Sequence, residues 1–395
     1  MTVKKDKLRE LVEKYAERIR VLRRTIHAHP ETSNEEYQTA ALLAAEMKEL
    51  GLDVKTGIGG NGLIGTLHGR KPGRTVALRA DMDALSISEA TELPFASRHA
   101  GKMHACGHDG HMSILMGAAH VLNELRDTFD GDIIFVCQPA EENSPHGGAK
   151  SIVASGVLDG IDAIYGLHVW PTLPTGQIGV KAGPLMAASD RLTVTIRGKA
   201  SHAAMPHKGI DAVVAACRFV SAAQDSISRK INPLAPAVLT FGKITGGTRY
   251  NIMADEVVIE GTCRTYDKET QAVIEGHLQN LIRGFDTIYG TESELAYEKG
   301  YGAVVNSAEQ AAFAAAVAAE RFGEEALPAI TEPAMTAEDF SGYLEVYDGA
   351  FFWLGATAPG AVVYPLHNER FSLDEDCLPV GVEMLSALAL AALKK

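Results

Sequence analysis

The sequence predicts an α/β fold with a mixed, largely parallel sheet flanked by helices, interrupted by an inserted ferredoxin-like α+β domain. In residues 1–186 and again in 299–395, short apolar segments rich in β-branched residues alternate with helical segments, which is typical of a largely parallel sheet. Between them, residues 187–298 follow the order β-α-β-β-α-β, the order of a ferredoxin-like unit that can bury its own small core. We therefore expect a main domain built from the two outer segments and an inserted domain at 187–298.

The chain begins with two predicted helices. Residues 5–29 show the charge spacing of an amphipathic helix, and a second helix is expected over 34–50. Ser33 and Glu36 match the pattern of a capping box at the start of the second helix, and Gly51 stands where a C-cap glycine is expected.

Three predicted strands of the main domain end in acidic or histidine side chains. The apolar segments TVALRADMDAL, DIIFVCQPAEEN and DAIYGLHV each read as a buried strand. Ligands of parallel sheets bind beyond the carboxyl ends of the strands. We therefore expect one rim of the sheet to carry Asp81, Asp83, Glu141, Glu142 and His168.

The segment HACGHDGH, which starts at His104, is the strongest candidate for a metal-binding or catalytic segment. It places Cys106, His108 and Asp109 on a loop just before a helical segment, and thiol, imidazole and carboxylate are ligands for divalent transition metals. Taken alone, the segment also fits a solvated turn with scattered histidines. The strand-end side chains expected at the same rim favour a metal site.

The remaining elements complete the two domains. The inserted domain is expected to contain helices at 211–228 and 268–288 and the strands RLTVTIRG, AVLTFGKIT, EVVIEGTCRT and SELAYE. The main domain then resumes with a helix near 308–322, the strand FFWLGA, a loop that carries His367, and a last helix from about residue 379.

Composition narrows the possible partners and the compartment. With 37 basic and 50 acidic residues, the formal charge of −13 opposes binding to nucleic acid or to an anionic membrane surface. No run of about 18 apolar residues suggests a membrane span, and the N-terminus lacks the apolar core of a signal peptide. The five cysteines are odd in number and widely spread, which favours a reducing compartment. We expect a cytoplasmic protein with a small-molecule ligand.

Several motifs in series closely resemble the M20 metallopeptidase family. Within it, the chain is most similar to the amidohydrolase branch that holds hippurate hydrolases, N-acyl-amino-acid deacylases and auxin-conjugate hydrolases. The resemblance spans nearly the whole chain, through RRTIHAHPETSNEE, ALRADMDAL, HACGHDGH, QPAEEN, GLHVWP, SHAAMPH, NIMADE to GTCRT, MTAEDF and LHNERF. It implies a zinc-peptidase-like catalytic domain and a lid or dimerisation role for the inserted domain.

The resemblance also implies two divalent metal ions per subunit, zinc or else manganese, cobalt or nickel. Cys106 would bridge the ions, with Glu142 and His367 completing one side and His108 and His168 the other. A thiolate between two cations stays deprotonated, and imidazole and carboxylate groups suit all four metals.

Glu141, beside the implied ligand Glu142, resembles the family's general base. Because adjacent side chains on a strand point in opposite directions, the chain must bend if both are to reach the site. Where more distant relatives carry His-x-Asp, this chain has Asp81-Met82-Asp83. Asp83 is expected either to orient a ligand from behind or to cap the turn that follows it.

Three residues of the inserted domain match positions that face the active site in related enzymes, often from a partner subunit. His202 is expected to hydrogen-bond the developing oxyanion, and Asn251 and Arg264 to hold a substrate carboxylate. For Arg264, a plain surface charge is the alternative.

The leading hypothesis is a binuclear metal-dependent amidohydrolase that cleaves the amide bond of N-acyl amino acids, with acetyl, benzoyl or similar acyl groups. Dipeptidase or N-carbamoyl-amino-acid hydrolase activity is an alternative, since the same site would accept other acyl groups. A non-catalytic protein that binds such conjugates is a further alternative, which the presence of all five ligands and the base disfavours. A homodimer through the inserted domain is expected from the resemblance and from the edge strand that such a unit leaves exposed.

Overall fold

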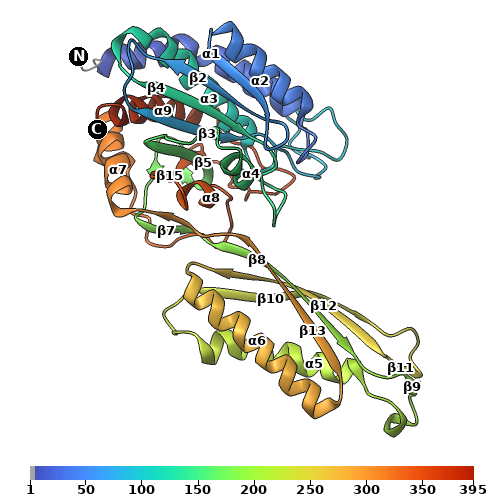
Figure 1. Ribbon diagram of the computed structural model, residues 1–395. Coiled ribbons are helices and arrows are strands. Elements are labelled where there is room, and N and C mark those ends of the chain that lie inside the picture. The colour runs from blue at the N-terminus through green and yellow to red at the C-terminus, as the bar shows by residue number, and fades with distance from the viewer. Residues whose placement is uncertain (1–4) are drawn as a thin grey trace. The chain divides into compact units, whose positions relative to one another are not determined.

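The computed structural model describes residues 5–395, and the chain divides into two compact units (Figure 1). Unit 1 contains the residues up to Leu185 together with Val305–Glu332 and Asp339–Lys395, and unit 2 contains Met186–Val304 and Pro333–Glu338. The segment predicted as inserted, 187–298, lies within unit 2. The short segment 333–338 joins this unit through backbone hydrogen bonds between the N–H of Ala187 and carbonyl oxygens of residues 334 and 336.

Unit 1 is built on a seven-stranded sheet with the order β1-β2-β4-β3-β5-β15-β6. The neighbours among β4, β3, β5 and β15 run parallel, and the strands added at either edge pair antiparallel. The mixed α/β sheet predicted from the sequence is thereby confirmed. The strands are β1 (Asp53–Ile58), β2 (Gly62–His68), β3 (Thr75–Asp81), β4 (Asp132–Gln138), β5 (Ala163–Pro174), β6 (Ile178–Gly179) and β15 (Gly349–Thr357).

Three long helices pack against one another and share the main core of unit 1 with the sheet. The central one, α3, is buried on nearly every side, which explains why its sequence has no polar face. Gly117 permits the close packing, because a Cβ atom there would lie 2.6 Å from Val382 of α9 and 2.7 Å from Ile19 of α1. The helices of unit 1 are α1 (Lys5–Ala28), α2 (Tyr37–Glu49), α3 (His108–Glu124), α4 (Ala149–Ala154), α7 (Ala308–Phe322), α8 (Ser341–Leu344) and α9 (Cys377–Ala392).

The predicted capping box of α2 is wrong. The helix begins at Tyr37, three residues later than expected, and the Ser33 hydroxyl instead donates to Asp83 Oδ2 at 2.6 Å. The first turn is capped by Glu31, whose carboxylate accepts two of its backbone N–H groups. The predicted C-cap is confirmed, since Gly51 follows the helix with φ +75°.

Unit 2 is a ferredoxin-like α+β domain, as predicted. Its sheet has the order β10-β12-β8-β13 with every pair antiparallel, and Figure 1 shows α5 and α6 side by side on one face. The four strands are β8 (Ala188–Arg197), β10 (Ala237–Gly246), β12 (Glu256–Thr265) and β13 (Glu292–Tyr301), and the helices are α5 (Ala212–Ala223) and α6 (Lys268–Tyr289). A small ladder joins β9 (Ser201–His202) to β11 (Ile252–Met253), and the chain passes between the units through β7 (Gly183–Met186) and β14 (Val304–Asn306).

Among the helices of residues 5–395, not one combines the length and the apolar character that crossing a bilayer requires.

Candidate metal centre

The predicted ligands converge just beyond the carboxyl end of β4, at the N-terminus of α3 and in the middle of β5. The expectation that the third strand ends at His168 is wrong, because β5 continues for six residues beyond it to Pro174. One ligand atom each from Cys106, His108 and His168 lies within 4.8 Å of the others, and the same holds for Cys106, Glu142 and His367. Cys106 belongs to both groups. The five side chains therefore form two clusters that share a sulfur atom, which is the arrangement that a thiolate bridging two cations needs.

His108 has one ring nitrogen engaged and the other available. Its Nδ1 lies 2.8 Å from the carbonyl oxygen of Asp83, which can only accept a hydrogen bond, so Nδ1 carries a proton. Nε2 is buried, has no hydrogen-bond partner among the described residues and lies 3.6 Å from Asp81 Oδ2. Burial alone would lower the pKa of His108, but the charges of Asp81 and Asp83 outweigh it and raise the pKa to about 10. The site thus holds surplus negative charge that a metal ion at Nε2 would neutralise.

His168 and Cys106 face each other, with His168 Nε2 3.3 Å from the sulfur atom. Nδ1 of His168 lies 2.7 Å from the carbonyl oxygen of Val169 and therefore donates, which leaves the lone pair of Nε2 directed to the cluster. Burial, assisted by neighbouring His111, holds the pKa of His168 well below its usual value, so the imidazole is neutral, as a metal ligand must be. Burial and the nearby Glu142 carboxylate raise the pKa of the Cys106 thiol.

The bend that the adjacent glutamates require is present. β4 ends at Gln138, and Ala140 adopts the left-handed conformation with φ +57°. The next two backbone N–H groups, of Glu141 and Glu142, donate to Asp83 Oδ1 and Oδ2 at 3.1 and 2.9 Å. Asp83 Oδ1 also lies 3.4 Å from His108 Nδ1. Asp83 therefore contacts both a candidate ligand and the turn that carries the candidate base, rather than capping the turn after its own strand.

His367 closes the cluster from a loop after β15. It has φ +64°, its backbone N–H donates to the carbonyl of Ala105 at 2.8 Å, and Nε2 lies 3.1 Å from Glu142 Oε1. Its side chain is 51 % exposed, whereas that of Glu142 is 12 % exposed. His367 thus marks the side of the cluster that is open to solvent.

Sequence reasoning missed the hydrogen-bond chain that supports these ligands. His111, one helical turn after His108, donates from Nδ1 to Asp81 Oδ1 at 2.6 Å and accepts at Nε2 from the backbone N–H of Val169 at 2.9 Å. Since both nitrogens are engaged, His111 supports the cluster and is not a ligand. The buried Arg79 donates to Asp81 Oδ2 at 2.8 Å. The only sequence signal was the spacing of three between the histidines, which places both at the start of α3.

Asp109, a candidate ligand by sequence, belongs to a different network. Its Oδ2 lies 2.7 Å from Arg23 Nε and 2.8 Å from His27 Nδ1, both on α1. Although burial alone would raise the pKa of Asp109, these partners hold it well below its usual value. Asp109 therefore joins α3 to α1 and is directed away from the cluster.

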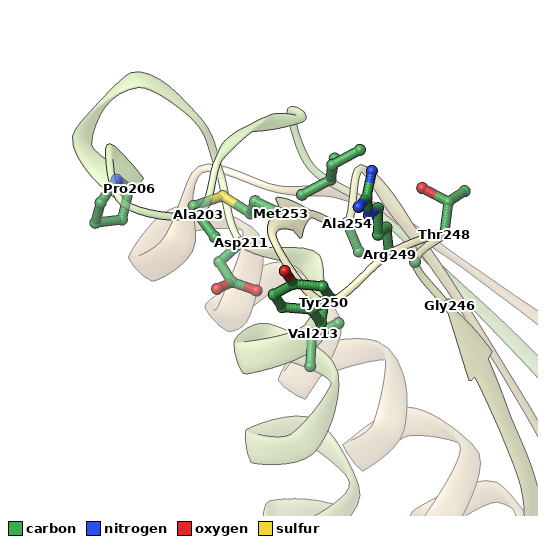
Figure 2. A pocket seen from close by; sticks show the side chains of 12 residues that line it. Ala203, Pro206, Asp211, Val213, Gly246, Thr248, Arg249, Tyr250, Met253 and Ala254 are labelled. Carbon is green, nitrogen blue, oxygen red and sulfur yellow. The ribbon is translucent and has the colours of Figure 1, made fainter.

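In unit 2, His202 and Asn251 lie on neighbouring backbone segments. β9 pairs with β11, and the N–H of Ala203 donates to the carbonyl oxygen of Asn251 at 3.2 Å. His202 is exposed, and the side-chain oxygen of Asn251 is buried without a partner among the described residues. Beside them is a hollow of about 500 Å³, shown in Figure 2, whose lining includes Arg249 and Tyr250.

Arg264 lies at the opposite end of β12. Arg264 is eight positions after Glu256, the first residue of β12, which follows β11. Eight positions correspond to roughly 26 Å of extended strand. Its half-buried guanidinium donates to Thr262 Oγ1 and to the carbonyl oxygen of Cys263, so it is no plain surface charge. One copy of unit 2 does not bring Asn251 and Arg264 together, and a shared contact with one carboxylate would require residues from two copies.

This fold and this cluster of histidine, cysteine and glutamate side chains define a hydrolase of the metallopeptidase type. The chain belongs to peptidase family M20/M25/M40, whose sequence model matches residues 77–391. It is 40 % identical over 307 residues to the N-acyl-L-amino acid amidohydrolase of Geobacillus stearothermophilus, covering 76 % of this chain and 81 % of the relative. It is 35 % identical to thermostable carboxypeptidase 1 of Saccharolobus solfataricus, covering 98 % of both chains.

A solved structure shares the whole architecture. The Bacillus subtilis YXEP protein, described as a dinuclear metal-binding peptidase of family M20, matches with a TM-score of 0.85 and 33 % identity, covering 97 % of this chain and 99 % of that one.

Proposed function

We propose that the protein is a binuclear metal-dependent amidohydrolase that cleaves N-acyl-L-amino acids to a carboxylate and a free amino acid. The observation that carries the proposal is the pair of ligand clusters sharing Cys106. The two ions would be zinc, or manganese, cobalt or nickel, which all accept this donor set. The Geobacillus relative supports the N-acyl-amino-acid substrate class.

In the proposed reaction, Cys106, Glu142 and His367 would hold one ion, and His108 and His168, together with Cys106, would hold the second. When bound, the ions would supply Lewis-acid activation of water and of the acyl oxygen. The carboxylate of Glu141 takes the proton from the attacking water and passes it to the leaving nitrogen. The backbone hydrogen bonds from residues 141 and 142 to Asp83 keep that carboxylate on a fixed turn.

Residues of unit 2 are proposed to contact the substrate. His202 donates a hydrogen bond to the developing oxyanion, whereas Asn251 and Arg264 bind polar groups of the amino acid. Asn251 precedes β11 near the start of β12, whereas Arg264 lies near the end of β12. This separation favours roles at different substrate groups, or contributions from two copies.

A substrate panel tests the proposal. We expect chelator-treated protein to be inactive, and added zinc, manganese, cobalt or nickel to restore amine release from N-acetyl or N-benzoyl amino acids. Dipeptides and N-carbamoyl amino acids belong in the same panel as the alternative substrates. Folded, metal-loaded protein that releases no amine from any of them would contradict the proposal and favour a conjugate-binding protein.

Carboxypeptidase activity is the second candidate. The Saccharolobus relative carries that name and matches this chain over nearly its full length. Both activities would hydrolyse an amide bond next to a free carboxylate, so the rates on unmodified peptides and on N-acetyl amino acids separate them. Peptides with an amidated C-terminus are the control that lacks the carboxylate. Faster turnover of unmodified peptides than of N-acetyl amino acids would favour the carboxypeptidase.

We also propose a homodimer formed through unit 2. In the described part of the chain, β10 pairs with β12 alone, so its outer edge is open. All of its residues from 242 to 246 are exposed, and Ile244 is 52 % exposed. Exposed edge strands of this kind favour pairing with another strand.

Sedimentation tests the dimer. The expected mass is twice 42.1 kDa, and Ile244→Lys is expected to shift the protein toward the monomer. Ile288→Lys is the matched control, because Ile288 is 73 % exposed on α6. A parent protein that sediments only at 42.1 kDa at working concentration would exclude the dimer.

We further propose a cytoplasmic location. All five cysteines are free thiols, and Cys217 is exposed, which suits a reducing compartment.

A further inference from the structure

Three consecutive backbone N–H groups at the end of β4 all donate to buried carboxylates. The N–H of Ala140 lies 2.9 Å from Glu36 Oε1, and those of Glu141 and Glu142 lie 3.1 and 2.9 Å from the oxygens of Asp83. Asp83 also contacts His108, whereas Glu36 comes from the segment before α2 and has no role in the chemistry described above. The turn that presents Glu141 is thus held by two carboxylates from distant parts of the chain.

Both carboxylate oxygens of Glu36 accept hydrogen bonds, and one of the donors belongs to this turn. Glu36 is fully buried, and a buried carboxylate is tolerated only when its oxygens are hydrogen-bonded. Oε1 accepts a second hydrogen bond from the N–H of Asn34 at 2.9 Å, and Oε2 accepts one from Asn61 Nδ2 at 3.0 Å. The carboxylate therefore joins the start of α2, the loop between β1 and β2, and the turn after β4.

The hydrogen bond from Ala140 to Glu36 matters because of the backbone conformation of Ala140. Its φ of +57° is disfavoured for a residue with a Cβ atom and persists only when neighbouring groups impose it. If the hydrogen bond to Glu36 were lost, Ala140 would relax toward negative φ, and the two side chains that follow it would leave their present directions.

We propose that Glu36 is a positioning residue of the hydrolytic site: its carboxylate holds Ala140 in the left-handed conformation and thereby aims Glu141 and Glu142 at the metal centre. The inference rests on the proposed function, in which Glu141 is the base and Glu142 a metal ligand. It assigns to Glu36 no contact with substrate or metal.

The test compares Glu36→Ala with Glu36→Gln. Removing a group that orients metal ligands typically costs about 10- to 100-fold in activity or metal affinity, and we expect Glu36→Ala to lower kcat and the affinity for cobalt within that range, with a smaller change in KM. The absorption spectrum of the cobalt-loaded protein should change as well, because it reports ligand geometry. Glu36→Gln keeps an acceptor oxygen for Ala140 and Asn34, and its amide N–H can donate to Asn61 once the Asn61 side-chain amide rotates to present its oxygen. This variant should restore kcat, cobalt affinity and spectrum.

Two further comparisons separate a positioning role of Glu36 from an effect of the substitution on folding. Glu35→Ala is the matched control, since Glu35 is the exposed neighbour that pairs with Lys102, and it should behave as the parent. Ala140→Val, which leaves Glu36 in place but disfavours positive φ, should reproduce the Glu36→Ala pattern, whereas Ala140→Gly should not.

The outcomes are distinguishable. A folded Glu36→Ala protein with parental kcat, cobalt affinity and cobalt spectrum would overturn the inference, as would a loss that Glu36→Gln fails to restore. If Glu36→Ala does not fold, Ala140→Val decides: parental behaviour of that variant overturns the inference. A parent protein that binds no cobalt and hydrolyses no substrate would instead refute the proposed function.

Discussion

Replacing Glu141 with glutamine is expected to lower kcat by about 100- to 10,000-fold, the range that a general base contributes. Glutamine has nearly the same shape as glutamate and keeps the backbone N–H that donates to Asp83, so the turn should persist. It cannot take a proton from water. We therefore expect both metal ions to remain bound while turnover collapses, measured by amine release and by metal analysis of the same sample.

Glu142→Gln provides the matched comparison. Glu142 lies one residue further along the same turn and belongs to the cluster with Cys106 and His367, so its variant should lose metal affinity as well as turnover. A Glu141→Gln protein that turns over at the parental rate would show that another group is the base. Equal metal loss in the two variants would show that Glu141 is a ligand.

Strand-end and loop positions in the sequence grouped several side chains that the structure brings close together. Hydrophobic runs marked β3, β4 and β5, and the rule that ligands gather at the carboxyl ends of parallel strands then grouped Asp83, Glu141, Glu142 and His168. For His168 the grouping held although β5 continues for six residues beyond it. Cys106 and His108 followed from ligand chemistry in one short segment. The strand-based inferences need only local periodicity and the parallel direction of the strands, and the loop-based inference needs only the chemistry of neighbouring side chains.

The supporting contacts could not be predicted in the same way, because they join residues far apart in the chain. Glu36 is 104 positions from the Ala140 that it binds, and Ser33 is 50 positions from Asp83. In the local sequence, Ser33 and Glu36 match a capping box. Nothing nearby reveals that each side chain instead binds a distant partner, Asp83 for Ser33 and Ala140 for Glu36. The tertiary hydrogen bonds prevail because they satisfy buried groups, which would be costly to leave unpaired.

In unit 2, too, the sequence predicted the elements but not all of the contacts between residues. The β-α-β-β-α-β order was readable from alternating and helical patterns, but motif matching grouped His202, Asn251 and Arg264 as one set. The strand register of β12 places Arg264 beside Ser189 of β8, far along the strand from the β9–β11 ladder. A motif names residues, whereas the register decides which of them can meet.

Cys106→Ser is expected to abolish tight binding of metal at the cluster. Cys106 is the one side chain common to both ligand groups, so its loss affects both ions, whereas loss of His168 or His367 would affect one. Since removing a mere supporting contact costs about 10- to 100-fold in metal affinity, losing the shared ligand should cost at least about 100-fold. Serine is a poor substitute because its hydroxyl resists deprotonation.

Metal content after exhaustive dialysis, and competition with a chromogenic chelator, measure the effect of Cys106→Ser. Cys217→Ser is the control, because Cys217 is exposed on α5 of unit 2, and it should retain the parental metal content. Thermal unfolding of the metal-free proteins shows whether the Cys106 variant is folded. A folded Cys106→Ser protein that still holds two ions with parental affinity would exclude a shared sulfur ligand and, with it, the two-cluster arrangement on which the proposed function rests.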